Sequence, residues 1–354
     1  MTLPLSRIAF FGLVTSIVTV FSINGCRRAT EPPNGPDTQG GHSMIPGSVG
    51  IKAISAGLAS GNSGDFELDL YVTDTNGNPV TNIDPSSISI QSALDTLFSP
   101  VGLGVATSLA SGPFSAELLI DQSNSMKWND PLKLRWQAAE LLLHAVNPAL
   151  TGSDEIQLST FNDYMFGLAS YGPFTHNGAD FDRAVDSLEN VLGPGTPLYD
   201  AMYAESDSLS VLATNANKAL IVFTDGDDNE SNHSLWGSIN HAKSLGIKVF
   251  AIALKTGIDP DSGATNLPEA KWALQNAAMA TGGATMQTSD PKQLVSYFGG
   301  LPKMMHGGTP YLQTKWHVKL PNQTSLTGSQ INGLLKITDK SGAIVSAPFN
   351  VQFQ

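Results

Sequence analysis

From Ser115 onward, short apolar segments alternate with segments of helical length, and this alternation restricts the fold more than any other feature of the chain. Strands separated by helices of this length form parallel sheets that are covered on both faces. The sequence therefore predicts an α/β domain with a doubly wound sheet. Asp130 and Pro131 predict the start of its first helix, as a cap followed by proline at the first helical position. The expected strands are Ala116–Ile120, Ile156–Phe161, Leu220–Phe223 and Val249–Leu254, and the expected helices are Leu132–Val146, Leu198–Leu212, Leu235–Leu245 and Pro268–Thr281.

The segments on either side of this domain have the pattern of β-structure. Apolar residues alternate with polar ones over residues 66–72 and again over residues 316–320, which is typical of half-buried strands. Residues 73–80 and 338–345 share the spacing T-D-x-x-G-x-x-V, which suits a type I turn and predicts two hairpins. The carboxy-terminal flank is too short to form its own core. We therefore expect flanks at 47–112 and 302–354 to fold together as an immunoglobulin-like sandwich, with an α/β domain at 113–301 inserted between them.

The amino terminus has the layout of a secretory signal. Arg7 precedes a short apolar run that reaches Ile23, and the run ends in Ile23-Asn24-Gly25-Cys26. This tetrapeptide resembles the lipobox of bacterial lipoproteins, which implies a signal peptide at 1–25 and lipidation of Cys26. Residues 26–46 are poor in apolar side chains and predict a flexible tether. Arg27 after the cysteine resembles lipoproteins of the outer membrane, so we expect a lipid-anchored envelope protein; the alternative is a buried free cysteine after a short anchor helix.

Charge and cysteine content exclude several classes of function. The net charge is −12, which argues against nucleic acid or an anionic lipid surface as the main partner. Contact with the membrane is therefore expected through the lipid anchor only. A single cysteine excludes internal disulfides and thiolate zinc clusters.

Oxygen-bearing side chains follow two of the expected strands and precede one expected helix. Asp121, Ser123 and Ser125 come directly after the first strand, Thr196 lies just before Leu198, and Asp225 follows the strand at 220–223. Because the carboxyl ends of parallel strands meet at one sheet edge, these groups are expected to converge. Carboxylates and hydroxyls are ligands of magnesium, although D-x-S-x-S by itself is also common in turns and caps.

Taken together, these segments resemble the von Willebrand factor A domain and its metal-ion-dependent adhesion site. The pattern is D-x-S-x-S, a distant threonine and a distant T-D-G, over roughly residues 113–301. The resemblance implies Mg²⁺ or Mn²⁺ held directly by Ser123 and Ser125, directly or through water by Thr196, and mainly through water by Asp121 and Asp225. It also implies a non-catalytic protein partner that offers an acidic side chain to the ion.

Two other functions stay open at this stage. The domain could be a structural spacer with a vestigial metal site, or a hydrolase whose hydroxyl nucleophile uses His176, His233 or His241 as its base. The sequence contains no G-x-S-x-G, H-E-x-x-H or P-loop motif in support of an enzyme. Residues near the expected site are also ambiguous. Trp128, Tyr199 and Trp236 fit either a partner-binding rim or the core, and Asp227 and Asp228 fit either a cation-attracting loop or a solvated turn.

Overall fold

The computed structural model describes residues 46–92, 96–145, 153–163, 168–175, 183, 185, 192–225, 228–254, 269–288, 290–322 and 325–354. The predicted signal peptide, Cys26, nearly all of the tether, His176 and Asp227 lie outside these residues. Within the described part of the chain, no helix has the length and apolar character needed to cross a membrane.

The middle of the chain forms a parallel sheet with the order β11-β10-β9-β6-β7, and β8 adds to β7 in the antiparallel direction. The predicted α/β fold with a doubly wound sheet is confirmed. The four strands predicted for this domain are present as β6, β7, β9 and β10, with their ends shifted by a few residues at most, whereas β8 and β11 were not predicted. The strands are β6 (Phe114–Asp121), β7 (Glu155–Phe161), β8 (Ala169–Thr175), β9 (Asn217–Thr224), β10 (Ile247–Ala253) and β11 (Ala284–Gln287).

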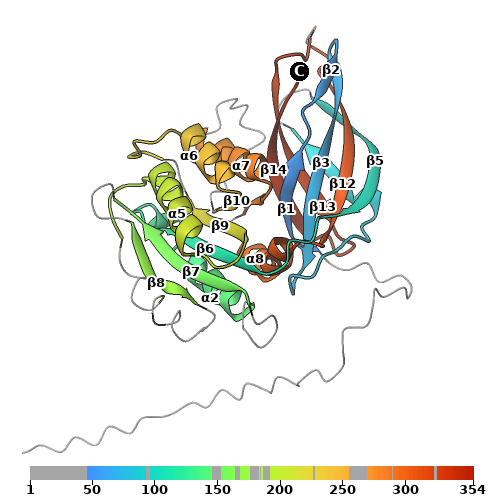
Figure 1. The fold of residues 1–354 in the computed structure, drawn as a ribbon. Helices are drawn as coiled ribbons and strands as arrows, with labels where there is room; N and C mark the ends of the chain where they lie inside the picture. Colours follow the sequence, from blue (N-terminus) through green and yellow to red (C-terminus); the bar gives the residue numbers. More distant parts are fainter. Residues whose placement is uncertain are drawn as a thin grey trace, which may run out of the picture. The chain divides into compact units, whose positions relative to one another are not determined.

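Helices cover both faces of this sheet (Figure 1). On one face α5 (Leu198–Leu212), α6 (Leu235–Ser244) and α7 (Glu269–Thr281) pack on the sheet through a core that includes Leu119, Met202 and Ile239. On the other face, α2 (Leu134–Ala145) and α8 (Pro291–His306) share a core that includes Trp136 and Tyr297. Strands buried on both sides explain the nearly continuous apolar runs of the sequence.

The first helix begins later than the sequence predicts. Asp130 and Pro131 lie in a turn, Lys133 has a φ of 53°, and α2 starts at Leu134. The carboxylate of Asp130 nevertheless caps this helix, because it accepts the main-chain N–H groups of Leu134 and Arg135 at 2.7 and 3.2 Å. A four-residue helix, α1 (Met126–Asn129), precedes the turn.

The two flanks supply the strands of a β-sandwich. One layer continues the large sheet in the order β5-β12-β3-β1, and the other has the order β14-β13-β4. Their facing side chains form one core, which contains Phe66, Trp316 and Phe349. The elements are β1 (Pro46–Ile54), β2 (Leu58–Ser60), β3 (Ser63–Asp74), η1 (Pro85–Ser87), β4 (Ile88–Gln91), β5 (Leu97–Thr107), β12 (Pro310–Lys319), β13 (Gln330–Thr338) and β14 (Ile344–Gln352).

Both predicted turns are present, in different settings. The N–H of Gly77 donates to the carbonyl of Asp74 at 3.0 Å, and the N–H of Gly342 donates to that of Asp339 at 3.1 Å. Both glycines have positive φ angles, which favours glycine at these positions. The second turn joins β13 to β14 as a hairpin. The first follows β3 and is continued only by an isolated bridge between Thr73 and Pro79, so it does not join two full strands.

The sandwich and the α/β domain share one continuous sheet. β1 pairs with β11 in the antiparallel direction, with Ile51 opposite Thr285. At this junction there is no room for a side chain at Gly50, because a Cβ there would lie 2.5 Å from Cε2 of Tyr297. Close packing of α8 against β1 therefore depends on a glycine.

Candidate metal site

The candidate site lies where β6 and β9 end side by side. The two strands pair in parallel, so Asp121 at the end of β6 and Asp225 just after β9 reach the same sheet edge. The segment before α5 is attached to this edge by main-chain contacts. Gly193 donates its N–H to the carbonyl of Gln122 at 2.9 Å and accepts the N–H of Asn124 at 2.8 Å.

Hydroxyl and carboxylate oxygens form a connected chain at this edge. The Oγ atoms of Ser123 and Ser125 lie 2.8 Å apart. Ser125 donates its hydroxyl to Oδ1 of Asp225 at 3.0 Å, and Asn129 donates its amide to Oδ2 at 2.7 Å. Hydrogen bonds between side chains thus connect Ser123, Ser125 and Asp225, three of the five predicted ligands. Ser125 is half-buried whereas Ser123 and Asp225 are buried, so the chain opens to solvent at Ser125.

Asp121 lies beneath this chain and is fully buried. Its Oδ1 accepts the main-chain N–H of Ser123 at 2.7 Å, and its Oδ2 accepts the hydroxyl of Thr224 at 2.6 Å. Burial and then the charge of Asp225 raise the pKa of Asp121 to about 6. Among the described residues, neither Asp121 nor Asp225 forms an ion pair with a lysine or arginine, so the site concentrates negative charge without a protein cation.

Thr196 is held by a side chain that sequence reasoning did not assign to the site. Asn229 accepts the main-chain N–H of Thr196 on its Oδ1 at 2.9 Å and donates its own N–H to the Thr196 carbonyl at 3.2 Å. Thr196 is buried. The loop after Asp225 therefore positions Thr196; the reciprocal pairing of two loops distant in sequence gave no local signal.

Asp228 helps to fix the same loop. It accepts the N–H of Tyr199 at the start of α5 at 3.0 Å, and it also accepts the Ser231 hydroxyl at 2.5 Å. Of the two interpretations made from the sequence, neither a free cation-attracting group nor a merely solvated turn describes this residue. Its carboxylate caps α5.

A buried ion pair supports the loop from the other side. Arg135 donates from Nη1 to Asp130 at 2.6 Å and from Nη2 to Oε1 of Gln122 at 2.9 Å. All three residues are buried. Gln122, which the motif leaves as an arbitrary residue, therefore connects the metal-site loop to the start of α2.

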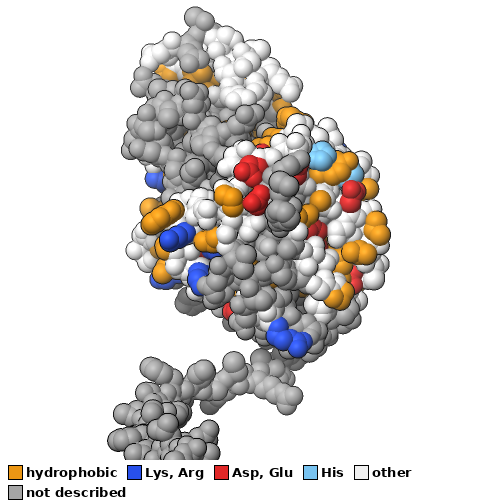
Figure 2. Space-filling model, turned by 90° about the vertical axis from the view of Figure 1, so that its left-hand side faces the viewer, with side chains coloured by type: hydrophobic (Ala, Val, Ile, Leu, Met, Phe, Trp, Pro, Cys, Tyr) orange, Lys and Arg blue, Asp and Glu red, His pale blue; other side chains and the backbone are white. Residues whose placement is uncertain are grey.

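The three aromatic residues that lie near the site in sequence differ in exposure. Trp128 is 76% exposed and Trp236 is 54% exposed, whereas Tyr199 packs against the core beneath α5. Of the three aromatic residues that the sequence left open, the two tryptophans are thus available to a partner. The face drawn in Figure 2 shows its described hydrophobic side chains in separate patches among acidic, histidine, lysine and arginine side chains.

The oxygens present suit a hard divalent cation. The group combines two carboxylates with serine and threonine hydroxyls, and such oxygens are the ligands of Mg²⁺ and Mn²⁺. No cluster of three or more His, Cys, Asp or Glu that could hold a metal occurs among the described residues. A cation at this edge would therefore depend on hydroxyls, as the predicted set of Asp121, Ser123, Ser125, Thr196 and Asp225 requires.

The comparison with family models decides the nature of the central domain. Residues 118–289 match the model of the von Willebrand factor type A domain. The chain contains a von Willebrand factor type A domain. Comparison with curated proteins gives no match.

The solved structures that match this chain include three of low sequence identity. The open form of the pilus adhesin SpaC from Lactobacillus rhamnosus GG is 12% identical over 85% of this chain and 47% of its own, with a TM-score of 0.46. The chain thus spans about half the length of that adhesin. A von Willebrand factor type A protein from Catenulispora acidiphila is 14% identical, with coverage of 89% and 76% and a TM-score of 0.43. An aerotolerance-related membrane protein from Bacteroides fragilis is 19% identical, with coverage of 54% and 98% and a TM-score of 0.41.

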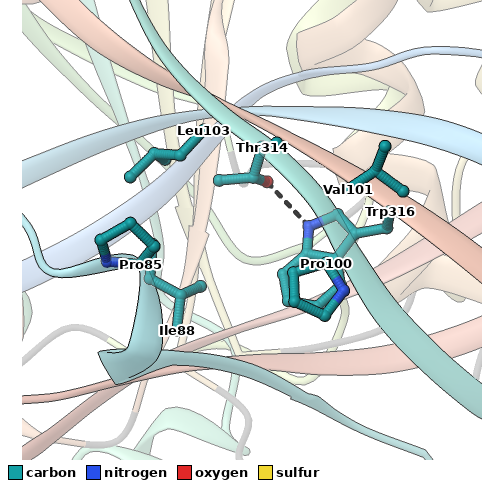
Figure 3. Close-up of a pocket in the computed structure, with 8 residues that line it drawn as sticks. Pro85, Ile88, Pro100, Val101, Leu103, Thr314 and Trp316 are labelled. Atoms are coloured by element: carbon teal, nitrogen blue, oxygen red, sulfur yellow. Dashed lines mark hydrogen bonds between the residues drawn. The ribbon is translucent and has the colours of Figure 1, made fainter.

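A pocket outside the type A domain lies in the β-sandwich. It has a volume of about 370 Å³ and opens between β5, β12 and the η1–β4 segment of the sandwich (Figure 3). The Oγ1 of Thr314 accepts the indole N–H of Trp316 at 2.9 Å inside it. None of its lining residues carries an acid or a base: they are Pro85, Ile88, Pro100, Val101, Gly102, Leu103, Thr314 and Trp316.

Proposed function

We propose that this chain is a cell-envelope lipoprotein whose type A domain binds a protein partner, without catalysis, through Mg²⁺ or Mn²⁺. The observation that carries the proposal is the oxygen chain of Ser123, Ser125 and Asp225, which is connected internally and open to solvent at Ser125. A vestigial site would not need to keep these oxygens in contact at a solvent-facing edge.

The roles proposed for the site residues are those that the resemblance to the metal-ion-dependent adhesion site implies. Ser123 and Ser125 would hold the ion directly, and Thr196 directly or through water. Asp121 and Asp225 would act mainly through bound water and supply the charge that balances the ion. When bound, the ion supplies a positively charged position that an acidic side chain of the partner can occupy. The exposed Trp128 lies on α1, which begins immediately after Ser125, so a partner at the ion would also meet an aromatic surface.

The amino-terminal segment would attach the protein to the membrane, and the flanks would display the type A domain. Cys26 would carry the lipid after removal of residues 1–25, and residues 26–46 would act as the tether from the outer membrane. The two flanks, 47–112 and 302–354, would form the sandwich on which the type A domain at 113–301 is displayed. Pairing of β12 with both β3 and β5 supports this division.

Affinity capture tests the binding function. The exported domain, residues 47–354, is immobilised and exposed to an envelope extract in Mg²⁺ or in EDTA, with Asp225→Ala as the comparison. We expect proteins that are retained in Mg²⁺ by the natural sequence and lost both in EDTA and with the variant. Retention of the same proteins under all conditions would refute metal-dependent binding.

Membrane attachment has its own test. A Cys26→Ala form that is exported is expected in the soluble fraction of the envelope, whereas the natural chain is expected with the membrane. If the variant still fractionates quantitatively with membranes, the lipid anchor is wrong.

A further inference from the structure

The sheet face beneath α5 buries two carboxyl groups that have no part in the candidate metal site. Glu117 on β6 is 0% exposed and Glu205 on α5 is 1% exposed. α5 packs on β6, on the face seen beneath α5 in Figure 1. Burial of acidic side chains without a cationic partner is costly, so the arrangement requires a compensating group.

Hydroxyl groups satisfy only half of the carboxyl oxygens. Ser159 on β7 donates its hydroxyl to Oε1 of Glu117 at 2.5 Å, and Ser170 on β8 donates to Oε1 of Glu205 at 3.1 Å. Oε2 of Glu117 and Oε2 of Glu205 have no hydrogen-bond partner. Ser159 and Ser208 also interact with Glu205, but each hydroxyl has only one proton to donate, and Oε2 of both glutamates stays without a partner. Two ionised carboxylates would leave buried charged oxygens without any donor.

The other charged groups on the surrounding elements are engaged elsewhere. On β7, Glu155 accepts the Ser115 hydroxyl at 2.6 Å. On β9, Lys218 donates its ammonium to the carbonyl of Ser210 at 2.8 Å. On α6, His241 pairs with Asp207 at 2.8 Å.

Among the described residues, these contacts leave the two glutamates without an ion pair. Burial, and then the charge of Glu205, raise the pKa of Glu117 well above its usual range. Burial likewise raises the pKa of Glu205.

We propose that Glu117 and Glu205 form a buried proton-binding pair, spanned by Ser159, that keeps at least one proton at neutral pH and holds α5 on β6 in that state. The retained acid O–H supplies the donor that the unpartnered oxygens lack. When the last proton leaves to solvent, two negative charges face each other in the interior. The contact between α5 and β6 then weakens.

The sign of the pH dependence follows from proton linkage. A group whose pKa is raised by folding contributes its stability at low pH and loses it as the pH rises through the folded-state value. The natural protein should therefore become less stable to urea between about pH 5 and about pH 9, the range above the ordinary glutamate pKa. The double variant Glu117→Gln with Glu205→Gln keeps the shape of both side chains, and its stability should change less over this range.

Infrared spectroscopy tests the proton directly. At neutral pH the natural protein should show the carbonyl stretch of a protonated carboxylic acid, and the double variant should lack it. Each single variant provides the same test where the double variant does not fold. Glu140→Gln is the matched control, because Glu140 is an exposed glutamate on α2.

Two results would overturn the proposal. The first is that the natural protein shows no acid carbonyl band that disappears in the glutamine variants. This result would mean that the pair is ionised and held by a bound cation. The second is an equal pH dependence of urea stability in the natural protein and in every folded glutamine variant. Glu140→Gln should change neither measurement.

Discussion

The side-chain amide of Gln275, on α7, hydrogen-bonds to both main-chain polar groups of Asn350, on β14. Its Nε2 donates to the Asn350 carbonyl at 3.0 Å, and its Oε1 accepts the Asn350 N–H at 3.1 Å. β14 is the end strand of the smaller sheet, so this one amide satisfies main-chain groups that an end strand leaves unpaired. The type A domain thereby closes one edge of the sandwich.

We predict that Gln275→Ala destabilises the whole described fold rather than the type A domain alone. It removes two hydrogen bonds and leaves main-chain groups of the half-buried Asn350 unpaired, at a cost of roughly 1–3 kcal/mol. The free energy of unfolding, measured in urea, checks this value. Gln137→Ala, at an exposed position of α2, should cost less than about 0.5 kcal/mol. Equal effects of the two substitutions would mean that the Gln275–Asn350 contact does not hold the two parts together.

The ion pair beneath the metal-site loop gives a second prediction. Arg135→Met would leave Asp130 buried without its cation, at a cost of about 3–5 kcal/mol. Arg135→Lys keeps the charge but cannot span Asp130 and Gln122 with a planar fork, so its cost should be intermediate. Urea unfolding of the natural protein and of the two variants gives the order of their free energies of unfolding. A Met variant as stable as the natural protein would show that the pair is not needed.

Local sequence patterns were enough to predict most of the strands and the residue types of the candidate site. Alternating apolar and helical segments are strong signals because β6, β7, β9 and β10 are buried on both faces. The serine and aspartate residues of the site follow these strands directly, and the structure brings Ser123, Ser125 and Asp225 into contact.

Other elements depend on contacts that local patterns do not contain. α8 includes Gly299, Gly300 and Pro302, which are poor helix formers, and it is held by buried side chains such as Tyr297 and Phe298. β5 is exposed along most of its length and contains Pro100. Asn229 reaches Thr196 across 33 positions of sequence. In each case the stabilising partner lies far along the chain.

Asn229 provides a third prediction, because it holds Thr196 without belonging to the proposed ligand set. Asn229→Ala should weaken Mg²⁺ binding by about 10-fold, as is usual when a group that orients a metal ligand is removed. Asn124→Ala is the control, since this exposed residue lies inside the same loop as Ser123 and Ser125. Calorimetric titration with Mg²⁺ measures the affinity of both variants. Unchanged Mg²⁺ affinity in Asn229→Ala would mean that metal binding does not depend on the positioning of Thr196 by Asn229.

The most direct measurement is calorimetric titration of the metal-free protein with Mg²⁺, in the natural sequence and in Ser125→Ala, Asp225→Ala and Asn124→Ala. We expect binding of one ion per chain, loss of at least about 10-fold in affinity for the first two variants, and natural affinity for the third. No binding by the natural protein, or equal binding by all four, would contradict a cation held by these oxygens.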